Sequence, residues 1–310
     1  MGKIAATLQQ ALATREQNDA RGATTARVLA DGPGWDVTDR MCTFGPHDRP
    51  FEEQHAGVCI AMVVAGSFEC RAAAGRELLT PGALLLGNAG ECFECGHRHG
   101  AGDRCIAFRF APAYFERLAA DAGMASGQLN FRRVRLPLLR AMSPLIARAC
   151  AGASGATSAA NGTGTVAGEA IWDELAIELA ATTLQASGAL TRAEAPSSAT
   201  ARSRVAQIVQ LIDGTPGAPH TLASLAAAAD LSAFYFLRMF QRVTGVTPHQ
   251  YLLRARLRAA ALRLRDDDSK IVDIAFDCGF NDLSNFNHAF RAEFATSPSA
   301  WRARGGARGS

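Results

Sequence analysis

Residues 271–302 read IVDIAFDCGFNDLSNFNHAFRAEFATSPSAWR, and residues 231–260 read LSAFYFLRMFQRVTGVTPHQYLLRARLRAA. The two stretches repeat one pattern, in which aromatic and proline positions recur 50 residues apart. In each copy, apolar residues spaced i, i+3, i+4 and i+7 predict a short helix. This helix lies just before residue 231 in one copy and starts at residue 271 in the other. A tight turn and a second helix follow, with Ser232 and Asp282 at the expected capping positions. The repeat predicts two helix-turn-helix units in the last third of the chain.

The second helix of each unit has an outward face opposite its apolar face. Such faces enter the major groove, where Arg pairs with guanine, Asn with adenine, and apolar side chains contact the thymine methyl group. The candidate DNA-contacting residues are Phe234, Leu237, Arg238 and Gln241 in the first unit and Leu283, Ser284, Asn287, His288 and Arg291 in the second. An ordinary solvated helix face would carry similar residues. Two such units in tandem favour double-stranded DNA as the partner.

A third helix is expected between the two units. About 18 residues of helix span roughly 27 Å, which is comparable with the spacing of about 34 Å between neighbouring major grooves. Five arginines on this helix could contact phosphates or simply keep the helix soluble. They are Arg254, Arg256, Arg258, Arg263 and Arg265.

Residues 222–302 resemble the DNA-binding domain of the AraC/XylS family of transcription regulators, on the strength of the two quoted stretches. The resemblance implies an effector-responsive regulator, usually an activator, that works with RNA polymerase. It also implies a cupin-like N-terminal domain that binds the effector and forms a homodimer. The resemblance implies base contacts at seven of the outward positions: Phe234, Leu237, Arg238, Leu283, Ser284, Asn287 and His288. Here His288 replaces the usual Arg, and Ala295 replaces a Gly whose backbone is often left-handed, at a cost of about 1 kcal/mol.

The front half shows short apolar runs separated by Gly and Pro, which predicts the strands of a barrel or sandwich. Leu- and Ala-rich segments then predict helices over 113–122, 136–150 and 168–186, with a small-residue loop over 151–168. The predicted fold class is α+β multidomain: an N-terminal cupin-like β-barrel with trailing helices, then an all-α domain of two helix-turn-helix units joined by a helix.

Four segments follow from this organisation. We expect a peripheral segment (1–34), an effector-sensing and dimerisation domain (35–190), a linker (191–203) and the DNA-binding domain (204–304).

Residues 91–105, ECFECGHRHGAGDRC, are dense in metal-ligating side chains. The candidate effector or metal residues are Cys92, Cys95, His97, His99 and Cys105. Their soft and borderline donors suit zinc or copper, although on a strand Cys92 would face away from Cys95. Packed structural cysteines, the wall of an organic-ligand pocket and a redox-active thiolate beside His are the alternatives.

The charge distribution and the lengths of the apolar runs narrow the possible partners and the location of the protein. The net charge is +3, but residues 201–310 carry 14 Lys and Arg against 9 Asp and Glu, so the basic end fits a polyanion partner. No apolar run approaches the roughly 20 residues that span a bilayer, so a cytoplasmic protein without membrane contact is expected. There its eight cysteines would stay reduced.

The sequence favours a non-enzymatic regulator over two other functions. They are a metal-dependent cupin enzyme and a protein-interaction module. Phe93 stands where metal cupins place a ligand His, which counts against the enzyme.

Overall fold

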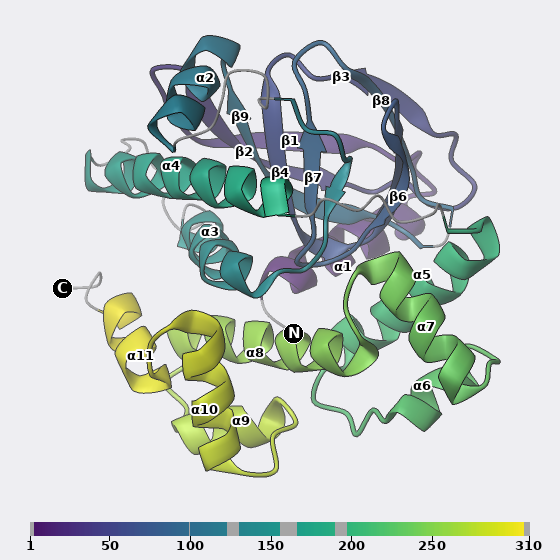
Figure 1. The fold of residues 1–310 in the computed structure, drawn as a ribbon. Coiled ribbons are helices and arrows are strands. Elements are labelled where there is room, and N and C mark those ends of the chain that lie inside the picture. The colour runs from purple at the N-terminus through teal and green to yellow at the C-terminus, as the bar shows by residue number, and fades with distance from the viewer. Residues whose placement is uncertain (1–2, 99, 123–129, 156–165, 190–196, 307–310) are drawn as a thin grey trace.

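The computed structural model describes residues 3–98, 100–122, 130–155, 166–189 and 197–306. The front half contains two antiparallel sheets with helices beside and below them, and the last third is helical (Figure 1). The α+β architecture expected from the sequence is therefore confirmed.

Two facing sheets form the β-rich part. The larger has the strand order β1-β2-β9-β4-β7-β10 and the smaller β3-β8-β5-β6. Their bounds are β1 Thr24–Gly32, β2 Trp35–Cys42, β3 Phe51–Gln54, β4 Val58–Gly66, β5 Phe68–Ala72, β6 Gly75–Leu79, β7 Leu84–Gly87, β8 Cys92–Gly96, β9 Asp103–Phe110 and β10 Arg135–Leu136. Side chains from both sheets meet in one buried cluster, in which Val63 and Ala107 from the larger sheet lie with Phe68 and Phe93 from the smaller.

The expected barrel is corrected in one respect: over the described ranges, the strand pairings leave two sheets and no closed barrel. The chain passes from the larger sheet to the smaller at Gly66, the last residue of β4, and one residue separates it from the start of β5. Gly66 has φ 69°, and a Cβ there would lie 2.2 Å from the Gly102 carbonyl oxygen. The tight, left-handed crossing lets consecutive strands lie in different sheets without a hydrogen-bonded pair between them.

Helices cover the outer face of the larger sheet. They are α1 Lys3–Gln17, α2 Pro112–Asp121, η2 Arg140–Met142, α3 Ser143–Gly155 and α4 Val166–Ala189. The predicted helix over 136–150 begins later, because Leu136 pairs with Leu84 as part of β10 and Pro137 follows. Of the predicted loop 151–168, the first five residues continue α3 and the last three begin α4, while 156–165 lie outside the described residues.

The segment 1–34, expected to be peripheral, packs against this core over the part that the structure describes, from residue 3 onward. Strand β1 pairs with β2 from Thr24 to Gly32, and Leu8 of α1 is 1% exposed. A strand edge and an apolar helix face both need a partner, and the larger sheet supplies each of them.

The C-terminal helices are α5 Ala199–Gly214, α6 Leu222–Ala228, α7 Ala233–Thr244, α8 Pro248–Asp266, α9 Ile271–Asp277, α10 Leu283–Phe294 and α11 Pro298–Gly306. Helix α8 crosses the lower part of the molecule, with α6 and α7 near one end and α9 and α10 near the other (Figure 1). The predicted linker 191–203 is partly wrong: residues 190–196 lie outside the described residues, but α5 begins at Ala199, capped by Ser198.

Among the described helices, none is by itself long and apolar enough to cross a membrane. The bent pair α6 and α7 meets the same length and composition test only when taken together.

Candidate nucleic-acid interface and ligand pocket

Helix α7 exposes the face predicted to contact DNA. Its start is capped by the Ser232 hydroxyl, which accepts from the Tyr235 amide, and Gly245 ends it with φ 80°. Phe236 and Phe240 are fully buried, so the opposite face is turned outward. Phe234 is 70% exposed, and the Arg238 guanidinium lies 5.7 Å from its ring centroid. The aromatic ring thus holds a cation at the surface by a cation–π contact.

The remaining predicted residues of α7 follow the same division. Gln241 is exposed and Leu237 is half-buried at the edge of the face. Tyr235, at the N-terminal tip, is 59% exposed and was missed, because the helical period placed it on neither face.

Helix α10 repeats this arrangement. The Asp282 carboxylate caps its start by accepting from the Asn285 amide at 2.8 Å, and Phe286, Phe290 and Phe294 are buried. Leu283, Ser284, His288 and Arg291 are exposed, and Asn287 is half-buried. The sequence therefore predicted which side chains of both helices are accessible, although DNA contact itself stays a prediction.

The arginines of α8 are neither free phosphate ligands nor merely solubilising. Arg254 donates to the Leu138 carbonyl, and Arg256 donates to the carbonyls of Pro216 and Ala218. Arg258 and Arg263 form ion pairs with nearby carboxylates, and Arg265 lies over the Trp301 ring. These side chains tie α8 to its surroundings, a role that helical spacing does not reveal.

Comparison with known proteins places this helical region in a family. A family model of a helix-turn-helix domain matches residues 225–304. The regulatory protein SoxS of Salmonella typhimurium is 35% identical over 97 residues, which are 31% of this chain and 91% of SoxS. The chain belongs to the AraC/XylS family of transcription regulators.

Other AraC/XylS proteins match over a similar region. The transcriptional activator RhaS of Klebsiella pneumoniae is 45% identical over 74 residues, which are 24% of this chain. The chain spans about a quarter of RhaS, 27% of its length. The DNA-binding domain of AdpA, solved with a target DNA, is 30% identical and covers 34% of this chain and 96% of its own, at a TM-score of 0.33.

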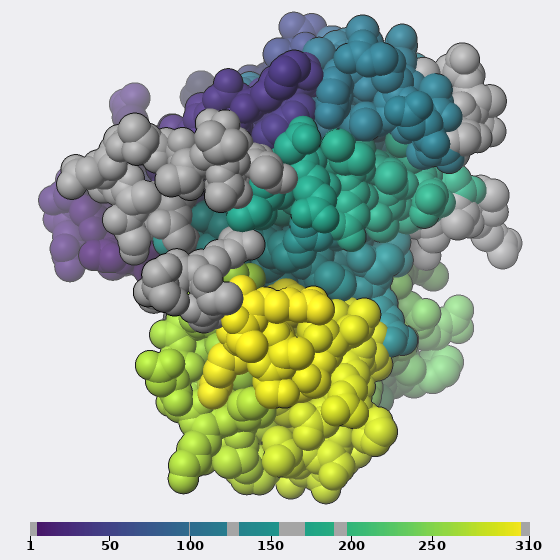
Figure 2. Space-filling view, turned by 90° about the vertical axis from the view of Figure 1, so that its left-hand side faces the viewer, coloured from purple at the N-terminus to yellow at the C-terminus, as the bar shows by residue number. Residues whose placement is uncertain are grey.

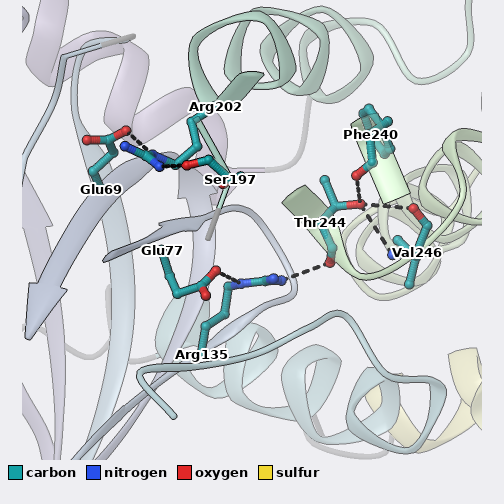
Figure 3. A network of polar contacts seen from close by, with 8 residues as sticks. All are labelled: Glu69, Glu77, Arg135, Ser197, Arg202, Phe240, Thr244 and Val246. Atoms are coloured by element: carbon teal, nitrogen blue, oxygen red, sulfur yellow. Dashed lines mark hydrogen bonds and ion pairs between the residues drawn. The ribbon is translucent and has the colours of Figure 1, made fainter. Parts of the chain in front are cut away.

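In this AraC/XylS protein the front half is docked onto the DNA-binding helices (Figure 3). Arg202 of α5 donates to Glu69 of β5 at 2.6 Å and to the Ser197 carbonyl, and both side chains of the ion pair are at most 7% exposed. Arg135 of β10 joins Glu77 of β6 to the carbonyl of Thr244, the last residue of α7. A cation near the last carbonyls of a helix also matches its dipole.

The second unit is held in the same way. Glu293 of α10 accepts from the Ser143 hydroxyl of α3 and pairs with Arg254 of α8 at 3.2 Å. The front half therefore contacts both helix-turn-helix units. In Figure 2 the last helices form a rounded lobe directly beneath the front half.

A cavity of about 120 Å³ lies in the front half, bounded by side chains of both sheets. One part of its wall is charged: Arg40 and Glu53 form an ion pair at 2.9 Å, and His55 is beside them. The other part contains Cys59, Cys95 and Cys105. Glu52, which precedes Glu53 on β3, does not line the cavity.

His55 is a neutral base in this wall. It stacks on Phe93 with ring centroids 4.2 Å apart. Burial lowers the pKa of His55 to about 4; Glu91 opposes the shift and Arg40 adds to it. Phe93, which replaces a metal-ligating His, therefore has a structural role as the stacking partner of a different His.

The Cys/His residues named from the sequence do not form one cluster. Cys92 is exposed, whereas Cys95, His97 and Cys105 are buried, as strand alternation predicted for Cys92 and Cys95. His99 lies outside the described residues. The hydrogen bond with Cys70, together with burial, raises the pKa of Cys95, and burial raises the pKa of Cys105, so neither thiol is an activated thiolate.

His97 instead contacts residues that are not among the candidates identified from the sequence. Its Nε2 lies 2.7 Å from Asp103 Oδ1, and Cys42 is close by. Burial alone would lower the pKa of His97, but the hydrogen bonds of Asp103 and Cys42 leave it at about 9. Cys42 is 55 residues before His97, and nothing local in the sequence signals that the two meet.

Proposed function

We propose that this protein is a sequence-specific DNA-binding transcription regulator, an activator, controlled by a small-molecule, metal or redox signal that its front half receives. The observation that carries the proposal is the pair of exposed faces on α7 and α10, one near each end of α8. Both are presented by capped helices packed on buried phenylalanines, so their side chains start from fixed positions. Family membership supports the same conclusion.

Signal transfer in this proposal runs through β5. Phe68 lines the cavity, and the next residue, Glu69, faces the opposite way and pairs with Arg202 of α5. A ligand that shifts β5 would change this docking contact. The effector must bind one arrangement of the two halves better than the other, because only differential affinity can move the equilibrium.

The partners in this proposal are double-stranded DNA in adjacent major grooves, a small-molecule effector, RNA polymerase and a second copy of the chain. The protein would act in the cytoplasm and catalyse no reaction. Membership of the AraC/XylS family supports each of these assignments.

The test is selection of genomic fragments by the purified full-length protein at near-physiological salt, with and without zinc or copper. Promoter fragments sharing paired motifs about one helical turn apart support the proposal. Their retention should fall steeply as salt rises, because phosphate contacts release counterions. Retention of nothing above background by residues 197–310 and by the full chain, in every metal condition, contradicts it. Salt-insensitive capture would indicate a hydrophobic docking surface instead.

A further inference from the structure

Three buried side chains converge at one end of the two sheets. Cys42 ends β2, and Asp103 begins β9 as its register partner on the neighbouring strand. His97 follows the last residue of β8, in the other sheet. One ligand atom from each of the three lies within 4.8 Å of the other two. We infer that Cys42, His97 and Asp103 form a binding site for a divalent, thiophilic metal ion such as zinc, which links the two sheets.

The geometry needs little change to accept zinc. Zinc binds sulfur at about 2.3 Å and nitrogen or oxygen at about 2.0–2.2 Å, so tetrahedral ligand atoms lie about 3.5 Å apart. His97 Nε2 and Asp103 Oδ1, now 2.7 Å apart, would separate slightly as the metal replaces the shared proton. Strand pairing holds Cys42 and Asp103 side by side, which leaves only the His97 side chain to adjust.

A fourth donor is already beside the three. Cys105 lies two residues after Asp103 on β9, so both side chains share one face of the strand. Its Sγ donates to Asp103 Oδ2 at 3.3 Å. Cys42, Asp103 and Cys105 also line the cavity, so an ion at this site would be reached from the cavity.

Burial and charge both favour an ion here. Cys42, His97 and Asp103 are at most 8% exposed. On binding, two protons would leave to solvent: the Cys42 thiol proton and the proton shared by His97 Nε2 and Asp103 Oδ1. One thiolate, one carboxylate, a neutral imidazole and a divalent cation then sum to zero charge, which suits a buried site. Sulfur and nitrogen donors disfavour magnesium and calcium.

The site has a route to the helical region. A methyl group added at Gly100, in the turn between His97 and Asp103, would lie 1.9 Å from the Gln210 amide nitrogen of α5. A methyl group at Gly102 would lie about 3 Å from Leu8 and Leu12 of α1. A metal that anchors both ends of this turn would fix the surface against which α5 packs. This regulatory meaning rests on the proposed function, whereas metal binding itself does not.

The experiment measures zinc on the full-length protein. Chelator-treated protein is incubated with Zn²⁺ alone, passed through a desalting column and analysed for metal, and its affinity is determined against a chromophoric chelator. We expect one zinc per chain and release of two protons on binding. Co²⁺ alone should give a thiolate-to-metal charge-transfer band and the visible bands of a tetrahedral ion.

The variants separate this site from other thiols. Cys42→Ser, His97→Gln and Asp103→Asn should each weaken zinc binding by about 100-fold or more, above the 10–100-fold typical of outer-shell changes. The matched control is Cys92→Ser, which removes the exposed cysteine and should bind zinc like the parent. If the core variants fail to fold, the Co²⁺ spectra of the parent and of Cys92→Ser decide.

Three outcomes would overturn the inference: no zinc on the parent, zinc lost with Cys92→Ser but kept with Cys42→Ser, or a Co²⁺ spectrum without a thiolate band. The DNA selection described above is independent of all three. Protein that retains promoter fragments but no zinc would refute the metal site and leave the proposed function standing.

Discussion

Arg238 is the side chain of α7 with the clearest means of discriminating between bases. It is exposed, and the Phe234 ring limits the positions that its guanidinium can take. A pre-positioned guanidinium can pair with guanine O6 and N7 together. Arg238→Ala should weaken binding to the selected sites by about 1–3 kcal/mol and relax preference at one base position.

Binding measured over a set of single-base variants of the selected site tests this prediction. Arg242→Ala, on the same helix but outside the predicted face, is the control. It should lower affinity evenly, if at all. An unchanged base preference in Arg238→Ala would show that the groove assignment is wrong.

His55 gives the front half a pH dependence. Its pKa of about 4 in the folded protein lies below the 6.5 of an unperturbed His, so the unfolded chain binds the proton more readily. The stabilising contribution is therefore complete above pH 6.5 and is lost as pH falls toward 4. Lowering the pKa of His55 from 6.5 to about 4 corresponds to roughly 3 kcal/mol.

Urea unfolding between pH 7 and pH 4 measures this contribution. His55→Gln should lose less stability than the parent over that interval, because the uncharged amide does not titrate. The exposed His249→Gln serves as the control and should follow the parent. Parallel curves for the parent and His55→Gln would contradict the assignment.

The exposure of individual side chains was predicted correctly where it follows from the helical repeat within one element. The helical spacing of Phe236 and Phe240 determines which side chains of α7 face outward, because 3.6 residues make one turn. By contrast, the pairing of Cys42 with Asp103 comes from the register of β2 and β9. These residues are far apart in the chain, and only strand pairing brings them together. Cys92 is exposed, as the alternation of side chains along a strand predicted from its spacing to Cys95.

At the scale of elements, the two recognition helices differ at their C-terminal ends. Both end in a left-handed residue, Gly245 after α7 and Ala295 after α10, with φ of 80° and 54°. The sequence predicted this strain at Ala295 from the usual Gly at that position. Ala295→Gly should stabilise the protein by about 1 kcal/mol, because glycine has no Cβ to clash with the backbone.

Thermal unfolding of the two reciprocal variants checks this expectation. Gly245→Ala should destabilise the protein by more than Ala295→Gly stabilises it, since its Cβ would also lie 2.5 Å from Pro137 Cβ. A lower melting temperature for Ala295→Gly would show that the left-handed position is not strained.

Element boundaries were least predictable where tertiary contacts override local pattern. Leu136 begins a Leu- and Ala-rich segment that predicts a helix, but it pairs with β7 as part of strand β10. The edge of the larger sheet offers backbone hydrogen bonds there. Residues 199–203 were expected in a linker and instead begin α5, whose Arg202 pairs with Glu69 across the two halves. Such contacts leave no periodic trace in the sequence.

At the scale of the whole molecule, stability of the docked arrangement depends on the buried Arg202–Glu69 pair. Removing Arg202 leaves the buried Glu69 carboxylate with the longer contact to Arg76, at 3.9 Å, so the cost should fall below the roughly 3–5 kcal/mol of a fully unpaired buried charge. Arg202→Ala should therefore separate a single unfolding transition into two, as the helical region comes away from the sheets. Calorimetry of the full-length protein reports this directly.

The matched control is Arg148→Ala. Arg148 pairs with Glu174 and Glu178 at the surface of the front half, and such pairs contribute about 0–1 kcal/mol. It should leave the number of transitions unchanged. A single transition at the parent's temperature in Arg202→Ala would mean that the pair does not hold the halves together.

The contacts that the arginines of α8 make with neighbouring elements also fix the angle between the two helix-turn-helix units. Because Arg254 and Arg256 anchor the helix to carbonyls outside it, α8 sets a rotational phase as well as a distance. One residue inserted into its middle would turn one unit by about 100° relative to the other while moving it only about 1.5 Å. Both recognition helices would stay intact, yet they could no longer face the same side of the duplex. Seven inserted residues would nearly restore the angle, and the protein would then favour half-sites spaced further apart.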